Sequence, residues 1–271
     1  METMKPLERS RLRILCGKTY YTALRYLQWY CSDKRYSKMK GKETLPQVIF
    51  AHKTPLLREL KNVDMWLQHN KINNLKIAVK RVNGILIHPG ETFSYWKLIG
   101  NPTERKGYMK GMVLFYGGFK AGTGGGLCQL SNLIYWMTIH TPLKVTERHR
   151  HSYDVFPDSN RTQPFGSGAT CVYNYRDLQI QNDTNQTYQL QLQVTDKDLC
   201  GEWRSTGEQK SKFEIYEKEH RITHEYWGDY MRHNLLHRKE YDSEGKLIED
   251  AYLTENHAIM MYQPFLSDGR D

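Results

Sequence analysis

The residues best suited to do chemistry lie between positions 117 and 194. Three consecutive glycines, Gly124, Gly125 and Gly126, lead through Leu127 to Cys128, and apolar residues then recur at helical spacing. This pattern predicts a loop that enters a buried helix at Cys128. Because a helix N-terminus presents free backbone N–H groups and the positive end of its dipole, we expect Cys128 to ionise readily and to act as a nucleophile. The alternative is a small buried hydrophobic residue, the usual role of a lone cysteine.

A second segment supplies groups that could activate such a thiol. Strand alternation from Leu143 to Val155 puts Glu147, His149 and His151 on the face that also carries the apolar residues. Burying these groups costs free energy unless they pair, which favours a histidine as general base for Cys128 and Glu147 as the group that orients its imidazole. Three alternatives stay open: a structural hydrogen-bond network, a frayed strand end, and a zinc site formed by Cys128 and both histidines.

Further residues are candidates for substrate contacts. Asn132 lies on the same side of the predicted helix as Cys128, and Gln129 follows the cysteine directly. The amides of Gly124 to Gly126 are candidates for stabilising an oxyanion. Asp177 is expected at the start of a strand, either as a site residue (a third catalytic group or a substrate contact) or as a residue that makes a turn bond. The glycine loop matches neither the P-loop nor the dinucleotide-binding pattern, so no nucleotide and no other cofactor is expected.

The elements that must position these residues indicate an α+β fold. Apolar spacing predicts helical segments at Val63–Asn70 and Asn73–Val82, followed by a strand at Ile85–Ile87. Residues 177–194 have the pattern of a half-buried antiparallel hairpin, and a turn at Asp242–Gly245 separates two later strands. We therefore expect an antiparallel sheet with a Gly-rich-loop-to-helix element, an N-terminal helical arm and a C-terminal β-hairpin tail. The corresponding regions are 1–44, 45–204 and 205–271.

The positive charge of the chain is concentrated at its start. The 271 residues carry a net charge of +9, and residues 1–42 hold 11 Lys and Arg against 3 Asp and Glu. The remaining body is therefore close to neutral, which argues against a nucleic-acid partner. Basic residues interleaved with aromatic ones in a predicted helix favour peripheral contact of residues 1–42 with an anionic membrane surface. The alternative is a helix that packs on the body with its charges solvated.

The compartment is predicted from what the sequence lacks. There is no run of about 18 apolar residues and no signal-peptide pattern, so we expect a cytoplasmic chain. Five widely spaced cysteines do not form a disulfide framework, and their thiols are expected to be free.

Several motifs, taken in order, resemble the VanW family. They are Pro89-Gly90-Glu91-Thr92-Phe93-Ser94, Gly124-Gly125-Gly126-Leu127-Cys128-Gln129-Leu130-Ser131-Asn132, Glu147-Arg148-His149-Arg150-His151, Gly168-Ala169-Thr170, Asp177-Leu178 and Asn182-Asp183-Thr184. The resemblance spans residues 45–203 and implies a link with glycopeptide resistance and the cell wall of Gram-positive bacteria. It implies no catalytic assignment. Gly168 stands where many members have an acidic residue. If that acid takes part in catalysis in the family, its absence weakens the thiol hypothesis for this chain.

Two hypotheses from different classes follow from the residues and the resemblance. In the first, the chain is a Cys-His hydrolase or acyl transferase that acts on an amide or ester of a cell-wall precursor peptide. In the second, it is a non-catalytic module that binds a peptidoglycan precursor or a partner protein with the same groups. A structural zinc site is a further alternative, and whether the chain is an enzyme stays open at this point.

Overall fold

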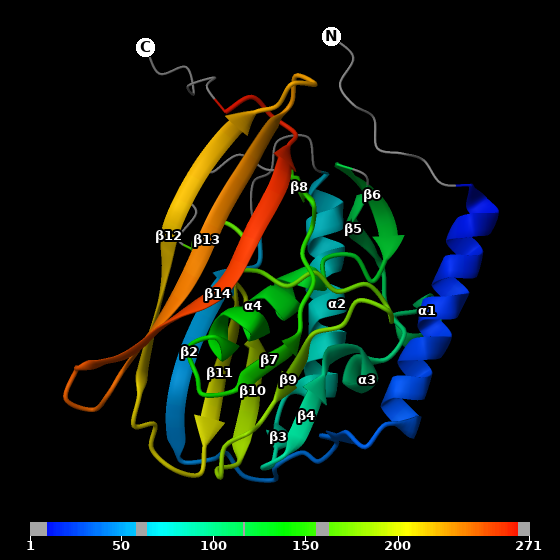
Figure 1. The fold of residues 1–271 in the computed structure, drawn as a ribbon. Helices are drawn as coiled ribbons and strands as arrows, with labels where there is room; N and C mark the ends of the chain where they lie inside the picture. The colour runs from blue at the N-terminus through cyan, green and yellow to red at the C-terminus, as the bar shows by residue number, and fades with distance from the viewer. Residues whose placement is uncertain (1–9, 58–63, 116, 156–162, 265–271) are drawn as a thin grey trace.

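The fold combines helices with small β-sheets, which confirms the predicted α+β class. A computed structural model describes residues 10–57, 64–115, 117–155 and 163–264 (Figure 1). The helical elements are α1 (Arg11–Cys31), α2 (Met65–Val82), α3 (Tyr95–Ile99), the 3-10 turn η1 (Glu104–Lys106) and α4 (Cys128–Thr138). Among the described residues, no helix is both long and apolar enough to cross a membrane.

The described strands pair into four sheets, mostly antiparallel. The first has the order β1 (Arg35–Tyr36), β4 (Glu91–Ser94), β9 (Gln179–Gln181), β7 (Lys144–Glu147). The second has the order β2 (Gln47–Pro55), β11 (Asp198–Ser205), β10 (Tyr188–Val194), β3 (Ile85–Ile87). The third has the order β12 (Lys212–His224), β13 (Tyr230–Tyr241), β14 (Leu247–Met260), β8 (Tyr153–Asp154), and β5 (Lys110–Phe115) pairs with β6 (Gly118–Thr123). Two contacts are parallel, β1 with β4 and β14 with β8.

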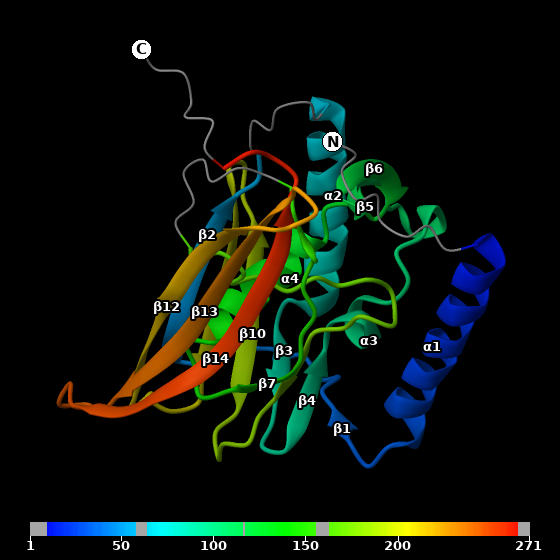
Figure 2. The same cartoon turned by 45° about the horizontal axis from the view of Figure 1, so that its top comes forward.

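Helix α4 lies at the centre of the core. Its residues Leu130, Leu133, Ile134 and Met137 are buried, and the helix packs on β2 and β11. Figures 1 and 2 show α4 between that sheet and the long C-terminal strands β13 and β14. Because α4 begins at Cys128, this packing fixes the predicted nucleophile near the middle of the molecule.

Helix α2 runs without interruption, whereas the sequence predicted two shorter segments with a break near Asn70. Asn70 and Asn73, which flank the gap between the two predicted segments, make tertiary contacts. The side-chain amide of Asn70 donates to the carbonyl of Lys110, and that of Asn73 donates to the carbonyl of Gly107. Bonds of this kind remove the competition with the helical backbone that usually makes asparagine a poor helix residue.

The predicted hairpin over residues 177–194 is wrong, although both of its strands exist. Strand β9 pairs with β4 and β7, while β10 pairs with β11 and β3 in another sheet. The connection is not a tight turn, because the Asn182 amide donates to the carbonyls of Ile87 and Gln186 and holds the loop against the end of β3. Alternating side chains indicated the strands correctly, but such a pattern does not say which strands pair.

The predicted strand over residues 143–155 is also shorter than expected. Strand β7 ends at Glu147 after a register shift, and β8 begins only at Tyr153 in a different sheet. Between them Arg148 donates to the carbonyls of Gly168 and Gly166 and to Thr254 Oγ1. Arg148 is therefore partly buried, not fully solvated as alternation suggested.

The C-terminal tail is a three-stranded meander of β12, β13 and β14, one strand more than the predicted hairpin. Its second turn falls at Asp242–Gly245, as predicted. All five cysteines have free thiols, which confirms the expectation from their spacing.

The first prediction concerns Asn74, which is fully buried and ties α2 to the glycine loop. Its amide donates to the carbonyls of Met109 and Gly125, and its Oδ1 accepts from the Met109 N–H. Asn74→Ala leaves these backbone groups unpaired and should lower the free energy of unfolding by about 2–3 kcal/mol in urea titrations. Asn73→Ala is the control, since it removes one solvent-accessible bond and should cost less than about 1 kcal/mol. Equal losses would contradict this role for Asn74.

Candidate functional site

Glu147 accepts hydrogen bonds from three separate parts of the chain. Its Oε2 accepts from Arg25 Nη1 at 2.7 Å, and its Oε1 accepts from Arg25 Nη2 and from the Asp177 N–H at 3.0 Å. His149 Nε2 lies 3.0 Å from the same Oε1. Burial alone would raise the pKa of Glu147, but the bonds from His149 and Arg25 and the charge of Arg25 lower it to about 2. Glu147 is therefore a carboxylate near neutral pH, and it requires His149 to carry its proton on Nε2.

Arg25, the partner of Glu147, comes from the N-terminal helix. The side chain is 8% exposed, and its Nε donates to the carbonyl of Asn174 at 3.1 Å. Trp29, one turn further along α1, donates from Nε1 to Ser94 Oγ at 3.0 Å. Sequence reasoning did not assign Arg25 to the site. The available signal was a single arginine that interrupts the most apolar part of the helix.

Asp177 lies beside this pair but faces the interior. Its oxygens accept from Ser94 Oγ and from the backbone N–H groups of Trp96 and Leu178. Burial raises the pKa of Asp177 to about 6, against these hydrogen bonds, and the charge of Glu147 adds to the rise. The side chain has no exposed surface. Asp177 therefore lies inside the protein, beside the N-terminus of α3. A substrate cannot reach it from the surface.

Cys128 is the first residue of α4, as predicted, and is partly buried. Its Sγ lies 3.9 Å from the carbonyl oxygen of Cys171. Burial raises the pKa of the Cys128 thiol, although backbone groups of Cys171 and of Cys128 itself oppose the rise. The direction of this shift favours the protonated thiol over the thiolate that the helix N-terminus led us to expect.

A short backbone segment joins Cys128 to His149. The N–H of Thr170 donates to the carbonyl of His149 at 2.8 Å, and the next residue, Cys171, contacts the thiol through its own carbonyl. His149 and Cys128 therefore contact the same short segment, residues 170–171, His149 through its backbone carbonyl and Cys128 through its thiol. Within the described residues, neither His149 nor His151 is hydrogen-bonded to Sγ of Cys128. Catalytic hydrogen bonds are often long in structures without substrate, so this arrangement is compatible with catalysis.

A cavity of about 230 Å³ lies next to this segment. Polar groups in its wall include Asn132, Arg150, His151, Asp154 and Thr170. Burial, with the nearby Arg176 and Arg150, lowers the pKa of His151 to about 4, so this imidazole is neutral at pH 7. The two histidines thus have different surroundings: His149 faces the Glu147 carboxylate, whereas His151 lines the cavity.

The charge of Asp154 in the cavity wall is balanced from the C-terminal sheet. Arg232 Nε lies 3.5 Å from Asp154 Oδ2, and the Tyr262 hydroxyl donates to the same oxygen at 2.8 Å. The guanidinium of Arg150 stacks on the Phe165 ring at 3.9 Å. The cavity therefore combines a cationic group with a neutral histidine, an arrangement suited to an anionic or strongly polar ligand.

The glycine loop has mainly a structural role in this arrangement. A Cβ on Gly125 would lie 2.2 Å from the backbone of Gly111, and Gly126 has φ of +90°, so neither position accepts another residue without strain. The N–H groups of Gly124 and Gly125 donate to the carbonyls of Met109 and Gly122. These two amides are therefore already bonded, contrary to the expectation that they are free to stabilise an oxyanion.

Gln129 and Asn132, two further predicted site residues, lie in different parts of the structure. The amide of Gln129 donates to Thr54 Oγ1 and to the carbonyl of Pro55, which ties α4 to the end of β2. Asn132 lines the cavity and accepts from the Ala169 N–H at 2.8 Å. A Cβ on Gly168 would lie 2.6 Å from Asn132 Oδ1, so an acidic residue there would displace this amide.

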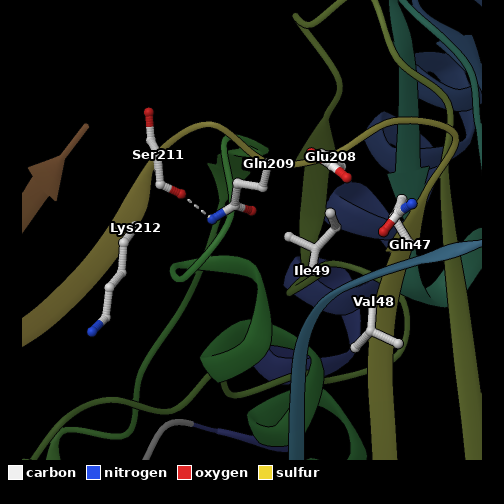
Figure 3. Close-up of a pocket in the computed structure, with 7 residues that line it drawn as sticks. All are labelled: Gln47, Val48, Ile49, Glu208, Gln209, Ser211 and Lys212. Atoms are coloured by element: carbon white, nitrogen blue, oxygen red, sulfur yellow. Dashed lines mark hydrogen bonds between the residues drawn. The ribbon is translucent and has the colours of Figure 1, made fainter. Parts of the chain in front are cut away.

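A second cavity, of about 330 Å³, is lined by residues that are distant from Cys128 in the sequence. Gln47, Val48, Ile49, Glu208, Gln209, Ser211 and Lys212 line it (Figure 3). Figure 3 shows the Gln209 amide turned toward Ser211, to whose carbonyl it donates. These lining residues include no cysteine or histidine, so thiol chemistry is not available in this cavity.

No ligand set for the zinc alternative is present in the part of the chain that the structure describes. No group of three His, Cys, Asp or Glu side chains there is arranged to hold a metal ion. In particular, His149 is directed to Glu147.

Comparison with known proteins identifies relatives over most of the chain. A family model described as "VanW like protein" matches residues 70–204. The vancomycin B-type resistance protein VanW of Enterococcus faecalis (strain ATCC 700802 / V583) is 32% identical over 227 residues, covering 84% of this chain and 82% of that protein. The uncharacterized protein YoaR of Bacillus subtilis (strain 168) is 28% identical over 117 residues, 43% of this chain and 37% of that protein. No solved structure matches the chain.

The second prediction tests the charge of Glu147. Because the folded-state pKa lies near 2, ionised Glu147 stabilises the fold above its ordinary pKa of 4.5, and this stabilisation is lost as the pH falls toward 2. Glu147→Gln should lower the free energy of unfolding by about 3 kcal/mol at pH 7, and the difference from wild type should vanish near pH 2.

The matched control is Glu202→Gln. Glu202 pairs with Arg204 at 2.8 Å but is 30% exposed, so its loss should cost less than about 1 kcal/mol. A pH-independent effect of Glu147→Gln would show that the ionised carboxylate is not the stabilising species.

Proposed function

This chain belongs to the VanW family, and on that premise we propose that it acts in glycopeptide (vancomycin) resistance or a related step of cell-wall metabolism. The proposed activity is thiol-dependent hydrolysis or acyl transfer on an amide or ester of a cell-wall precursor peptide. The observation that carries this proposal is the continuous set of contacts from Cys128 through residues 170–171 to His149 and Glu147.

Proton transfer is the first requirement of the proposed reaction, because burial keeps the Cys128 thiol protonated. Sγ attacks the carbonyl carbon of the scissile bond while the Cys128 proton passes to His149. The leaving amine or alkoxide then takes that proton, and a thioester remains on Cys128. Water or an acceptor amine attacks the thioester, gives up a proton through the same imidazole and restores the thiol. No oxidant or reductant enters this sequence.

His149 is the better candidate for the base. Its Nε2 is held by the Glu147 carboxylate, which leaves Nδ1 as the nitrogen to exchange a proton with the thiol. The carboxylate also stabilises the imidazolium that forms during attack. Within the described residues no carboxylate is bonded to His151, and Arg150 and Arg176 lie near it, so it suits contact with substrate.

The cavity next to α4 is the proposed site of the peptide end. A volume of about 230 Å³ is small for a ligand site, which favours one or two residues of a peptide over a large ligand. Arg150, Asn132 and Thr170 offer charge and hydrogen bonds for a terminal carboxylate of a D-alanyl or D-lactyl peptide. A cytoplasmic chain would meet such precursors at the inner face of the membrane.

A non-catalytic binding module is the second candidate, and one observation favours it. The thiol has a raised pKa and is not hydrogen-bonded to a described histidine, so it lacks the preformed thiolate of many reactive cysteines. In this alternative the same cavity binds the peptide end, and Cys128 is a packing residue.

The third prediction separates the two candidates by turnover. Full-length protein is incubated with pentapeptides that end in D-Ala-D-Ala or D-Ala-D-lactate, and the released terminal residue is quantified by mass spectrometry. Cys128→Ser and His149→Ala should each reduce the rate at least about 100-fold. His151→Ala should raise KM and leave kcat nearly unchanged. Cys200→Ser, in a partly exposed cysteine of β11, is the control and should retain wild-type rates.

Binding measurements on the same peptides complete the test. Turnover that survives in Cys128→Ser would contradict thiol catalysis. No turnover by wild type, together with saturable binding that His151→Ala weakens, would establish the binding module instead.

A further inference from the structure

Helix α1 presents an unusual apolar surface to the outside of the molecule. At 100° per residue, Leu12, Leu15, Ala23, Leu27 and Tyr30 lie along one side, which we call the outer stripe. Exposure is 70% for Leu12, 62% for Leu15, 56% for Leu27 and 71% for Tyr30. A soluble helix normally turns such a stripe toward the core, and an exposed apolar patch of this kind marks an interaction surface.

The opposite side of α1 holds the helix in this orientation. Arg25 and Trp29 are buried, and they bond to Glu147 and Ser94 of the body. Figures 1 and 2 both show α1 at the outer edge of the molecule, beside α3. Because rotation of α1 would break the ion pair between Arg25 and Glu147, the outer stripe cannot turn inward at low cost.

Charge indicates what covers the outer stripe. Helix α1 contains four basic residues and no Asp or Glu, and Arg11, Arg13 and Lys18 are exposed. The whole segment 1–42 carries a net charge of +8. A second copy of the chain would bring the same positive charge to the same surface and would be repelled. An anionic bilayer offers both the opposite charge and an apolar layer, and tyrosines are well suited to the headgroup boundary.

We propose that α1 docks on an anionic lipid bilayer, with the outer stripe in the boundary between headgroups and acyl chains. Arg13, which flanks the outer stripe, then lies near the lipid phosphates, and the charges of Arg11 and Lys18 add to the attraction of the whole helix to the anionic surface. This inference goes beyond the proposed function, because it rests on α1 alone and holds whether or not Cys128 is catalytic. It has one consequence for the site: since Arg25 bonds to Glu147 across α1, the His149–Glu147 pair lies roughly one helix diameter, about 10 Å, from the lipid surface.

The fourth prediction is tested by vesicle flotation of the full-length protein. Vesicles of phosphatidylcholine mixed with phosphatidylglycerol should carry the protein upward, and phosphatidylcholine alone should bind at least about tenfold less. The double variant Leu15→Ser/Leu27→Ser should lose at least about tenfold in binding to the anionic vesicles. Leu247→Ser/Ile248→Ser is the matched control: these residues are 47% and 57% exposed on β14, and their loss should not change flotation.

Each other outcome overturns the proposal. Equal binding to both vesicle types, no binding, or full binding by Leu15→Ser/Leu27→Ser would exclude anionic lipid as the occupant of the outer stripe. Sedimentation velocity without vesicles provides the remaining comparison. A dimer that the same double variant abolishes, in a protein that does not float, would assign the stripe to a second copy. Each variant should unfold at the same midpoint temperature as the wild type, which verifies that it is folded.

Discussion

The partly buried carboxylate of Glu147 is the constraint on which the arrangement of the site depends. A charge in this position is tolerated only with hydrogen-bonded partners, and they come from residue 25, residue 149 and the backbone of residue 177. Satisfying Glu147 therefore brings α1, the end of β7 and the approach to β9 to one point. The N-terminal helix is part of the site for this reason, although it is distant in sequence.

The two neighbouring carboxyl groups respond to their surroundings in opposite ways. Hydrogen bonds and the Arg25 charge lower the pKa of Glu147 to about 2, whereas burial raises the pKa of Asp177 to about 6. Glu147 is thus a permanent charge that can orient an imidazole, and Asp177 is an interior group that organises α3 through Ser94 and Trp96. Divergent pKa values in adjacent carboxyl groups often accompany functional sites, and here they separate an orienting group from a structural one.

Local patterns in the sequence predict most of the helices and strands. They do not predict which of these elements pack or pair with one another. The glycine run followed by helical spacing correctly predicted that α4 begins at Cys128, because both signals lie within a few residues. The pairing of Arg25 with Glu147 and the separation of β9 from β10 depend on contacts between distant residues, which periodicity does not report. The raised pKa of Cys128 was missed for a related reason: the helix N-terminus is visible in the sequence, but the burial of the thiol, which raises its pKa, is not.

The central claim is that Cys128 forms a covalent acyl intermediate with the help of His149, and it is tested most directly by trapping that intermediate. Wild-type protein is mixed with a cell-wall pentapeptide, quenched in acid and digested, and the peptide that carries Cys128 is weighed by mass spectrometry. The account predicts the mass of a thioester on Cys128, released by hydroxylamine and missing in His149→Ala. An unmodified Cys128 at a time when the peptide is being turned over would contradict the account, as would an adduct on another residue.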